Sequence, residues 1–314
     1  MKGNVRTANV TVIYMGASYE MELPEDGVPM TPRRKRPKKH LSTAQILFIT
    51  FIAALICVIL VFVAIYASGL RYIKLNTEIG GYVKFFGTVD GEGNPYKGEL
   101  YYSDGNTATV DMLNNKVTFS NGDVYTGSLN ASLRMDGHGK LEYNTGDVYE
   151  GAFADGVISG EGKFTYANGD TYEGMFADGM KNGSGVYTWF DGSTYTGDFV
   201  NDKKDGWGVY LWSDGSSYTG EYKNELKEGT GTYRFANGDV YSGNFSADSR
   251  TGHGTYTWAN GDEYIGNFED NEMNGTGTYR FASGRTFEGS FEDGILVRDL
   301  GGDNTSDGET SSEG

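Results

Sequence analysis

An aromatic residue followed two positions later by glycine returns every 23 residues through the C-terminal half of the chain. The aromatic residues of this series are Tyr149, Tyr172, Tyr195, Tyr218, Tyr241, Tyr264 and Phe287. Tyr125 stands 24 residues before Tyr149, so the first copy carries one inserted residue, and eight copies cover residues 122–291. A period of this length indicates a repeat array, in which each unit packs mainly on its neighbours. We therefore expect no single copy to fold alone.

Each copy contains two short runs in which aromatic residues alternate with glycines or small residues. In the copy at 146–168 the runs are residues 149–153 and 160–166. Period two is typical of a strand with one buried face, so each copy is predicted to be an antiparallel hairpin. Residue parity predicts a four-residue loop at 155–158, which sets Phe153 opposite Gly160. The glycine that ends every junction between copies, such as Gly169, predicts a three-residue loop with that glycine in the left-handed conformation.

These hairpins predict an all-β repeat array, an elongated single-layer antiparallel sheet of about eight hairpins. The inward positions form two aromatic rows along the array, and we expect these rows to be its core. One row contains Phe164, Tyr187, Tyr210, Tyr233, Tyr256 and Tyr279. The next row contains Tyr166, Trp189, Trp212, Phe235, Trp258 and Phe281. The terminal copies are predicted to be caps, and the last copy is predicted to lack a second strand.

The pattern Tyr-x-Gly-x-Phe, followed by a Gly-x-Gly strand and an Asn-Gly-Asp junction, resembles the MORN (membrane occupation and recognition nexus) repeat. The resemblance covers residues 122–291, more than half of the chain. The sequence departs from the MORN pattern at Leu129 and Leu141, which replace aromatic residues in the first copy, and at Phe287, which replaces tyrosine in the last. Residues 71–121 carry a degenerate version of the repeat pattern and are predicted to be an N-terminal cap. We place the array at 122–298 and a disordered acidic tail at 299–314.

The second strong feature is an uncharged apolar run from Ile46 to Ala67. As a helix it would be about 33 Å long, enough to cross a hydrocarbon core of roughly 30 Å. A narrow sheet offers no large core that could bury such a helix, and the 45 residues before the run disfavour a cleavable signal peptide. We therefore predict one transmembrane helix within residues 41–70. The chain's only cysteine, Cys57, lies inside it.

A cluster of basic residues precedes the predicted membrane helix. The cluster consists of Arg33, Arg34, Lys35, Arg36, Lys38 and Lys39, whereas only Arg71 and Lys74 follow the helix closely. Basic flanks stay on the cytoplasmic side of a membrane. The cluster therefore predicts a single-pass type II signal anchor in the cell membrane, with residues 1–40 cytoplasmic and the repeats extracytoplasmic. Contact between the cluster and anionic lipid is compatible with this topology. Within residues 1–40, alternation over 10–23 predicts a small hairpin that turns near 15–18.

Charge and residue types restrict the function of the repeats. Residues 1–74 carry a net charge of +6 and residues 75–314 a net charge of −23. So acidic a domain repels phosphates, which argues against a nucleic-acid partner and against repeats that lie flat on an anionic bilayer. His138 and His253 occupy an outward-facing position that holds residues of many types in the other copies. We therefore predict no catalytic residue, cofactor or metal site. Calcium bound between successive Asp-Gly turns is an alternative, although the 23-residue spacing differs from that of short calcium-binding repeats.

These inferences indicate a non-enzymatic, membrane-anchored scaffold or binding protein. Its repeated surface favours an extended or multivalent partner, either a protein of the cell envelope or a wall polymer, through avidity. Trp207 has the outward parity of its strand and is the candidate partner contact. The alternative resembles the role of junctophilins, in which cytosolic MORN repeats and a membrane helix together connect two membranes through contact with a second membrane or lipid.

Overall fold

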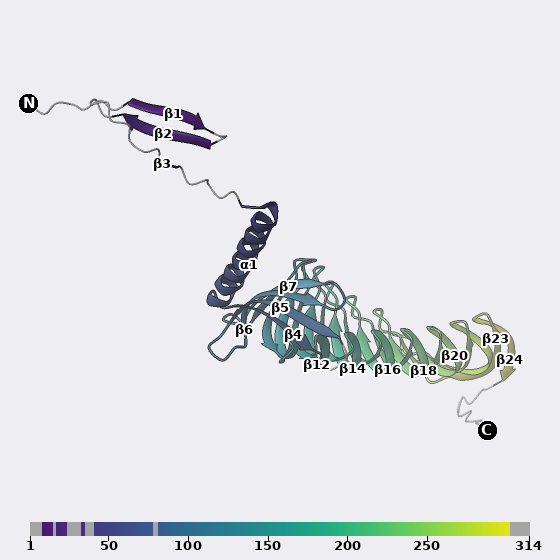
Figure 1. Ribbon diagram of the computed structural model, residues 1–314. Helices are drawn as coiled ribbons and strands as arrows, with labels where there is room; N and C mark the ends of the chain where they lie inside the picture. Colours follow the sequence, from purple (N-terminus) through teal and green to yellow (C-terminus); the bar gives the residue numbers. More distant parts are fainter. Residues whose placement is uncertain (1–7, 15–16, 24–32, 35–40, 78–80, 302–314) are drawn as a thin grey trace, which may run out of the picture. The chain divides into compact units, whose positions relative to one another are not determined.

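The computed structural model describes residues 8–14, 17–23, 33–34, 41–77 and 81–301. The chain divides into two units, Met1–Ile65 and Tyr66–Gly314, which are described separately. The first unit contains a three-stranded sheet in the order β1 (Ala8–Tyr14), β2 (Ala17–Leu23) and β3 (Arg33–Arg34) (Figure 1). Strands β1 and β2 pair antiparallel over their whole length, which confirms the predicted hairpin.

Arg33 and Arg34 of the basic cluster form β3 and pair with β2. Lys35, Arg36, Lys38 and Lys39 lie outside the described residues, and so does the predicted tail from residue 302 onward. The predicted membrane orientation and the proposed domain boundaries therefore stay predictions.

The apolar run forms the helix α1 (Thr43–Ala67). It begins with a capping box: Gln45 N donates to Ser42 Oγ at 3.2 Å, and Ser42 N donates to Gln45 Oε1 at 3.0 Å. After the helix, Gly69 has a φ of 77°, and Arg71 Nη1 donates to the Tyr66 carbonyl at 3.1 Å, which satisfies one of the last acceptors. None of the residues of α1 is buried. By length and composition, α1 can cross a membrane.

The second unit is one open antiparallel sheet of 21 strands, each paired with the next in chain order (Figure 1). The cap contains β4 (Leu70–Asn76), β5 (Tyr82–Val89), β6 (Pro95–Tyr102), β7 (Thr107–Asp111) and β8 (Lys116–Phe119). The array contains β9 (Val124–Leu129), β10 (Met135–Glu142), β11 (Val148–Ala154), β12 (Val157–Thr165), β13 (Thr171–Ala177), β14 (Met180–Thr188), β15 (Thr194–Val200), β16 (Lys203–Leu211), β17 (Ser217–Lys223), β18 (Leu226–Arg234), β19 (Val240–Ser246), β20 (Ser249–Thr257), β21 (Glu263–Glu269), β22 (Glu272–Arg280), β23 (Thr286–Glu292) and β24 (Ile295–Gly301). The predicted all-β hairpin array is confirmed.

The junction loops between copies have the predicted form. In the loop after β12, Tyr166 N donates to the Asp170 carbonyl at 2.9 Å, so three residues form the loop. Its last residue, Gly169, has a φ of 93°, and all eight junction glycines lie between 87° and 98°. Glycine adopts this backbone region without the steric cost that a Cβ brings.

The loop inside each hairpin is shorter than the predicted four residues. Ala154 pairs with Val157, so a two-residue turn at Asp155 and Gly156 joins β11 to β12. Both turn residues have positive φ, 42° and 90°, as in the type I′ turn whose twist matches that of paired strands. Phe153 therefore faces Ile158, and a bulge in β12 restores the predicted pairs between Gly151 and Gly162 and between Tyr149 and Phe164. The predicted opposition of Phe153 and Gly160 is wrong.

The tyrosine of each Tyr-x-Gly-x-Phe motif lies over a pair of glycines. In one copy, Gly197 and Gly208 are opposite each other on β15 and β16, and the ring of Tyr195 covers them. A Cβ added to Gly208 would stand 2.5 Å from the Tyr195 ring. The Tyr195 side chain is fully buried, and its hydroxyl donates to the Asp198 carbonyl at 3.1 Å. The motif therefore specifies both the central tyrosine and the space that the ring needs.

The last copy does contain a second strand, contrary to the sequence-based prediction. Strand β24 pairs with β23 and reaches Gly301, three residues beyond the predicted end of the array. It lacks the Gly-x-Gly pattern of the other second strands, and every one of its side chains is exposed. Hydrogen bonding to β23 is therefore enough to continue the sheet without adding to the aromatic core.

Candidate binding face of the repeats

A continuous track of partly buried rings runs along one face of the array. We call this the ring track: Tyr143, Phe164, Tyr166, Tyr187, Trp189, Tyr210, Trp212, Tyr233, Phe235, Tyr256, Trp258, Tyr279 and Phe281. Successive rings contact one another within and between copies, with centroids 4.3 Å apart for Tyr210 and Trp212 and 5.2 Å apart for Trp212 and Tyr233. These spacings favour ring–ring attraction. The track contains both aromatic rows that the sequence predicted, but these rings are only partly buried, so the expectation that they form the core of the array is wrong.

Beneath the track, the fully buried tyrosines form the inner core with a second set of rings. Tyr195 lies edge-on to Phe199 and to Tyr222 of the next copy, with centroids 5.1 and 5.3 Å apart. The same double contact with tyrosines of two copies is made by Phe153, Phe176, Phe199, Tyr222, Phe245 and Phe268. The core is therefore shared between neighbours rather than closed within one copy. This is the packing that a repeat array requires.

Four cations at 23-residue spacing lie among these rings. They are Lys181, Lys204, Lys227 and Arg250. The Lys204 ammonium is 5.2 Å from the Tyr210 ring centroid and 5.4 Å from the Tyr222 ring centroid, and its side chain is only 15% exposed. Rings attract a desolvated cation through their negative faces. This row of cations was not predicted from the sequence.

Each of these cations is matched to a turn residue of the following copy. Lys204 Nζ pairs with Glu225 Oε2 at 3.2 Å, and Lys227 Nζ pairs with Asp248 Oδ1 at 2.9 Å. The backbone N of Lys227 donates to the same Asp248 oxygen at 2.9 Å. Where the cation position is apolar, as at Ile158, the matching turn residue is glycine. The seven matches are Met135 with Gly156, Ile158 with Gly179, Lys181 with Asp202, Lys204 with Glu225, Lys227 with Asp248, Arg250 with Asn271, and Met273 with Gly294.

A second set of contacts between copies, which we call the junction clamp, links the junction loops. Asp239 Oδ1 accepts from Ala259 N of the next junction loop at 2.8 Å, and Asp239 Oδ2 accepts from the Tyr256 hydroxyl on β20 of its own hairpin at 2.6 Å. The Tyr256 hydrogen bond holds the pKa of Asp239 below its usual range, although burial opposes the shift. Asp239 and the equivalent Asp170 are buried, at 7% and 8% exposure. These periodic carboxylates therefore link one junction loop to the next.

Comparison with known families decides the nature of these repeats. The family model for the MORN repeat matches seven successive segments: residues 134–148, 149–171, 172–194, 195–217, 218–240, 241–263 and 264–284. The chain is a MORN-repeat protein. The MORN segments coincide with the hairpins of the array. Strands at the two ends of the array, β9, β23 and β24, continue the same sheet beyond the matched segments.

Other comparisons add little to the MORN assignment. No curated protein matches this sequence. Among solved structures, the TCP domain of SAS-4 from Drosophila melanogaster, in complex with a proline-rich motif of Ana2, is 13% identical with a TM-score of 0.26, over 65% of this chain and 96% of that chain. A streptogramin B lyase is 14% identical with a TM-score of 0.14, over 71% of this chain and 69% of that one. These scores are too low to support an argument.

Trp207, the predicted partner contact, lies on the face of the MORN array opposite the ring track. Its side chain is 52% exposed, which confirms the predicted outward direction. Trp212, five residues later, belongs to the ring track and is half-buried. His138 and His253 are exposed on the same outward face as Trp207. Among the residues that the structure describes, no group of three or more His, Cys, Asp and Glu side chains could hold a metal ion.

Proposed function

We propose that this protein is a membrane-anchored, non-enzymatic scaffold whose acidic MORN array lies outside the cell membrane and binds an extended partner along the ring track. The observation that carries the proposal is the repetition of the track: six successive copies each offer two partly buried rings in the same place. A surface of this kind suits a partner that repeats or extends along it, because many weak contacts add up through avidity. The partner class that we propose is an envelope protein or a wall polymer.

The electrostatics support a partner that is not polyanionic. The cations among the rings are already paired with turn residues, and the array as a whole is acidic. A polyanion would have to displace these carboxylates and approach a like-charged domain. Flat or apolar groups that stack on the exposed ring faces avoid both costs.

Two tryptophans on opposite faces of the array test this proposal. The full chain in detergent or in nanodiscs is mixed with detergent-extracted envelope proteins or purified wall polymer, and the bound fraction is measured. We expect Trp212→Ala to reduce binding severalfold and Trp207→Ala, the matched control, to leave binding unchanged. The opposite result would move the contact to the Trp207 face that was predicted from the sequence. Binding to anionic vesicles alone, at physiological salt, would contradict the proposal and favour the membrane-bridging alternative.

A further inference from the structure

The cap meets the first repeat at a cavity of about 290 Å³. Its walls are contributed by both parts: Tyr102 and Phe119 come from the cap, and Arg134, Met135 and Leu141 come from the first copy. Tyr102 and Phe119 stack with ring centroids 6.3 Å apart. The volume is at the lower end of the range for small-molecule sites, which are typically apolar with a few convergent polar groups.

The cavity exists because one ring of the array is missing. In the third copy the hydroxyl of Tyr187 reaches back to Asp170 Oδ2 at 2.8 Å. The equivalent positions in the first copy are Leu141 and Asp123, and both line the cavity. Leucine neither fills the space of the ring nor reaches the carboxylate. The departure from the repeat pattern at Leu141 therefore opens this space.

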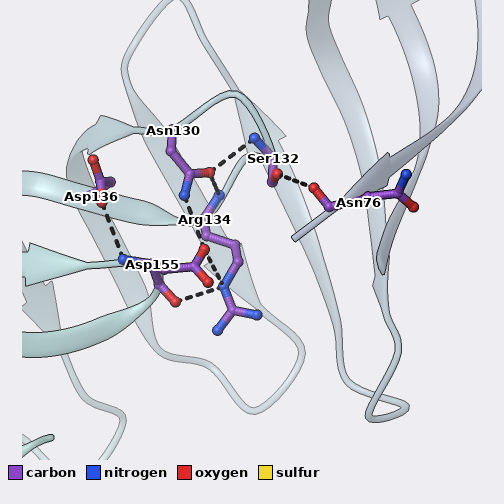
Figure 2. A network of polar contacts seen from close by, with 6 residues as sticks. All are labelled: Asn76, Asn130, Ser132, Arg134, Asp136 and Asp155. Carbon is purple, nitrogen blue, oxygen red and sulfur yellow. Dashed lines mark hydrogen bonds and ion pairs between the residues drawn. The ribbon is translucent and has the colours of Figure 1, made fainter. Parts of the chain in front are cut away.

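Arg134 is held in place on one side only. Arg134 Nε donates to the Asp155 carbonyl at 2.7 Å and pairs with Asp155 Oδ1 at 3.2 Å. Asn130 fixes Asp155 in turn, with Asn130 Nδ2 donating to Asp155 Oδ1 at 3.0 Å. Figure 2 shows the two terminal nitrogens of Arg134 pointing away from this network. They donate to none of the residues that the structure describes.

The other charged groups of the cavity already have partners. Asp123 accepts from Asn144 N at 2.9 Å and from Asn121 Nδ2 at 2.7 Å. Asp104 accepts from the backbone N and the side chain of Asn106. Among the charged groups that line the cavity, the terminal N–H groups of Arg134 are therefore the donors with no partner in the described residues. Their planar fork matches a carboxylate bidentately.

We propose that this cavity is a binding site for a small carboxylate that carries an aromatic or apolar group. The carboxylate accepts from the terminal nitrogens of Arg134, and the apolar group occupies the space between the Tyr102 and Phe119 rings and Leu141. Because Asp155 offsets the charge of Arg134, the recognition is directional and the affinity is modest. The site lies where the ring track would begin, at the missing ring of Leu141, and it does not depend on the side of the membrane on which the repeats lie.

N-acetyl-phenylalanine is the probe, and its neutral amide is the control ligand. Binding to the full chain in detergent is measured by ligand-observed NMR and by calorimetry. We expect a dissociation constant of about millimolar for the acid, as befits a ligand of this size, and binding at least about fivefold weaker for the amide. No binding of the acid, or equal binding of acid and amide, would overturn the proposal.

Two variants and one control locate the site. Leu141→Tyr restores the ring of the repeat pattern, so the protein should fold as before but lose binding. Arg134→Lys keeps the charge beside Asp155 but loses the fork, and should weaken binding at least about fivefold. Arg285→Lys, which lies at the other end of the array, should bind like the wild type. Thermal unfolding of each variant checks the fold. Unchanged binding by a folded Leu141→Tyr variant would contradict the assignment.

Discussion

Lys227 Nζ lies 2.9 Å from Asp248 Oδ1, and this same oxygen accepts the backbone N–H of Lys227. The two residues are 21 positions apart and belong to successive copies. Burial alone would raise the pKa of Asp248, but the hydrogen bonds from Lys227 lower it below its usual range. The Asp248 carboxylate, which lies in the turn of its own hairpin, therefore holds both the side chain and the backbone of Lys227 in the copy before it.

The match between each cation position and its turn residue predicts that a substitution at one position is compensated by a substitution at the other. Lys227→Met should lower the free energy of unfolding by about 1 kcal/mol, because it removes an ion pair whose lysine is largely covered by rings. Adding Asp248→Gly recreates the combination of Met273 and Gly294 and should bring the double variant to within about 0.5 kcal/mol of the wild type. Urea unfolding followed by tyrosine and tryptophan fluorescence measures the cycle. Strictly additive losses in the double variant would contradict this prediction.

The glycines beneath the tyrosine rings should be intolerant of alanine. Gly208→Ala places a Cβ 2.5 Å from the Tyr195 ring, and the ring cannot move because it is buried between copies. We expect a loss of about 3 kcal/mol. Gly91→Ala is the matched control, since no atom lies within 4 Å of its added Cβ. Its effect should stay within about 0.5 kcal/mol. Similar losses in both variants would show that the close contact with Tyr195 is not the cause.

Acid should loosen the junction clamps. The pKa of Asp239 is lowered by the Tyr256 hydroxyl against the effect of burial, so its contribution to stability is present above the unfolded pKa, about 3.9, and is lost as the pH falls through the folded value. We therefore expect thermal stability to fall below about pH 4. The fall should be smaller in Asp239→Asn, because the amide keeps an acceptor and does not titrate. An identical acid transition in the variant would argue against this clamp as a source of the pH dependence.

Alkali should act on the other partner of the clamp. Burial, reinforced by the Asp239 carboxylate, raises the pKa of Tyr256 to about 12. A raised folded pKa means that the contribution to stability is present below the unfolded pKa, about 10, and is lost as the pH rises to about 12. Ultraviolet difference spectra should therefore show Tyr256 ionising later than an exposed tyrosine. Comparison with Tyr256→Phe assigns the signal, and a normal titration at this position would contradict the burial of its hydroxyl in the clamp.

Much of the fold could be predicted because period and parity are local signals. The spacing of Tyr149, Gly151 and Phe153 is sufficient to predict the strands, and the left-handed Gly169 predicts the junction loop. The two-residue turn was missed because a bulge in β12 preserves the parity that the longer loop would have given. Strand β24 was missed because backbone pairing with β23 needs no aromatic pattern.

The contacts between copies were harder to predict than the hairpins. The match of Lys227 with Asp248 spans 21 residues and becomes visible only when all copies are compared position by position. The junction Asp239 looks like a solvated turn residue until its donors are traced to β20 and to the next junction loop. The cavity at the cap depends on how an irregular sheet meets a regular one, and Leu141 was the only sign of it in the sequence.

The side of the membrane on which the repeats lie is tested most directly by labelling single cysteines on intact cells. In a Cys57→Ser background, Ser184→Cys reports on the exposed outward face of the array and Thr7→Cys reports on the N-terminal segment. We predict that a membrane-impermeant maleimide labels Ser184→Cys on intact cells and labels Thr7→Cys only after permeabilisation. Labelling of Thr7→Cys on intact cells, with Ser184→Cys protected, would contradict an anchored scaffold with its repeats outside the cell.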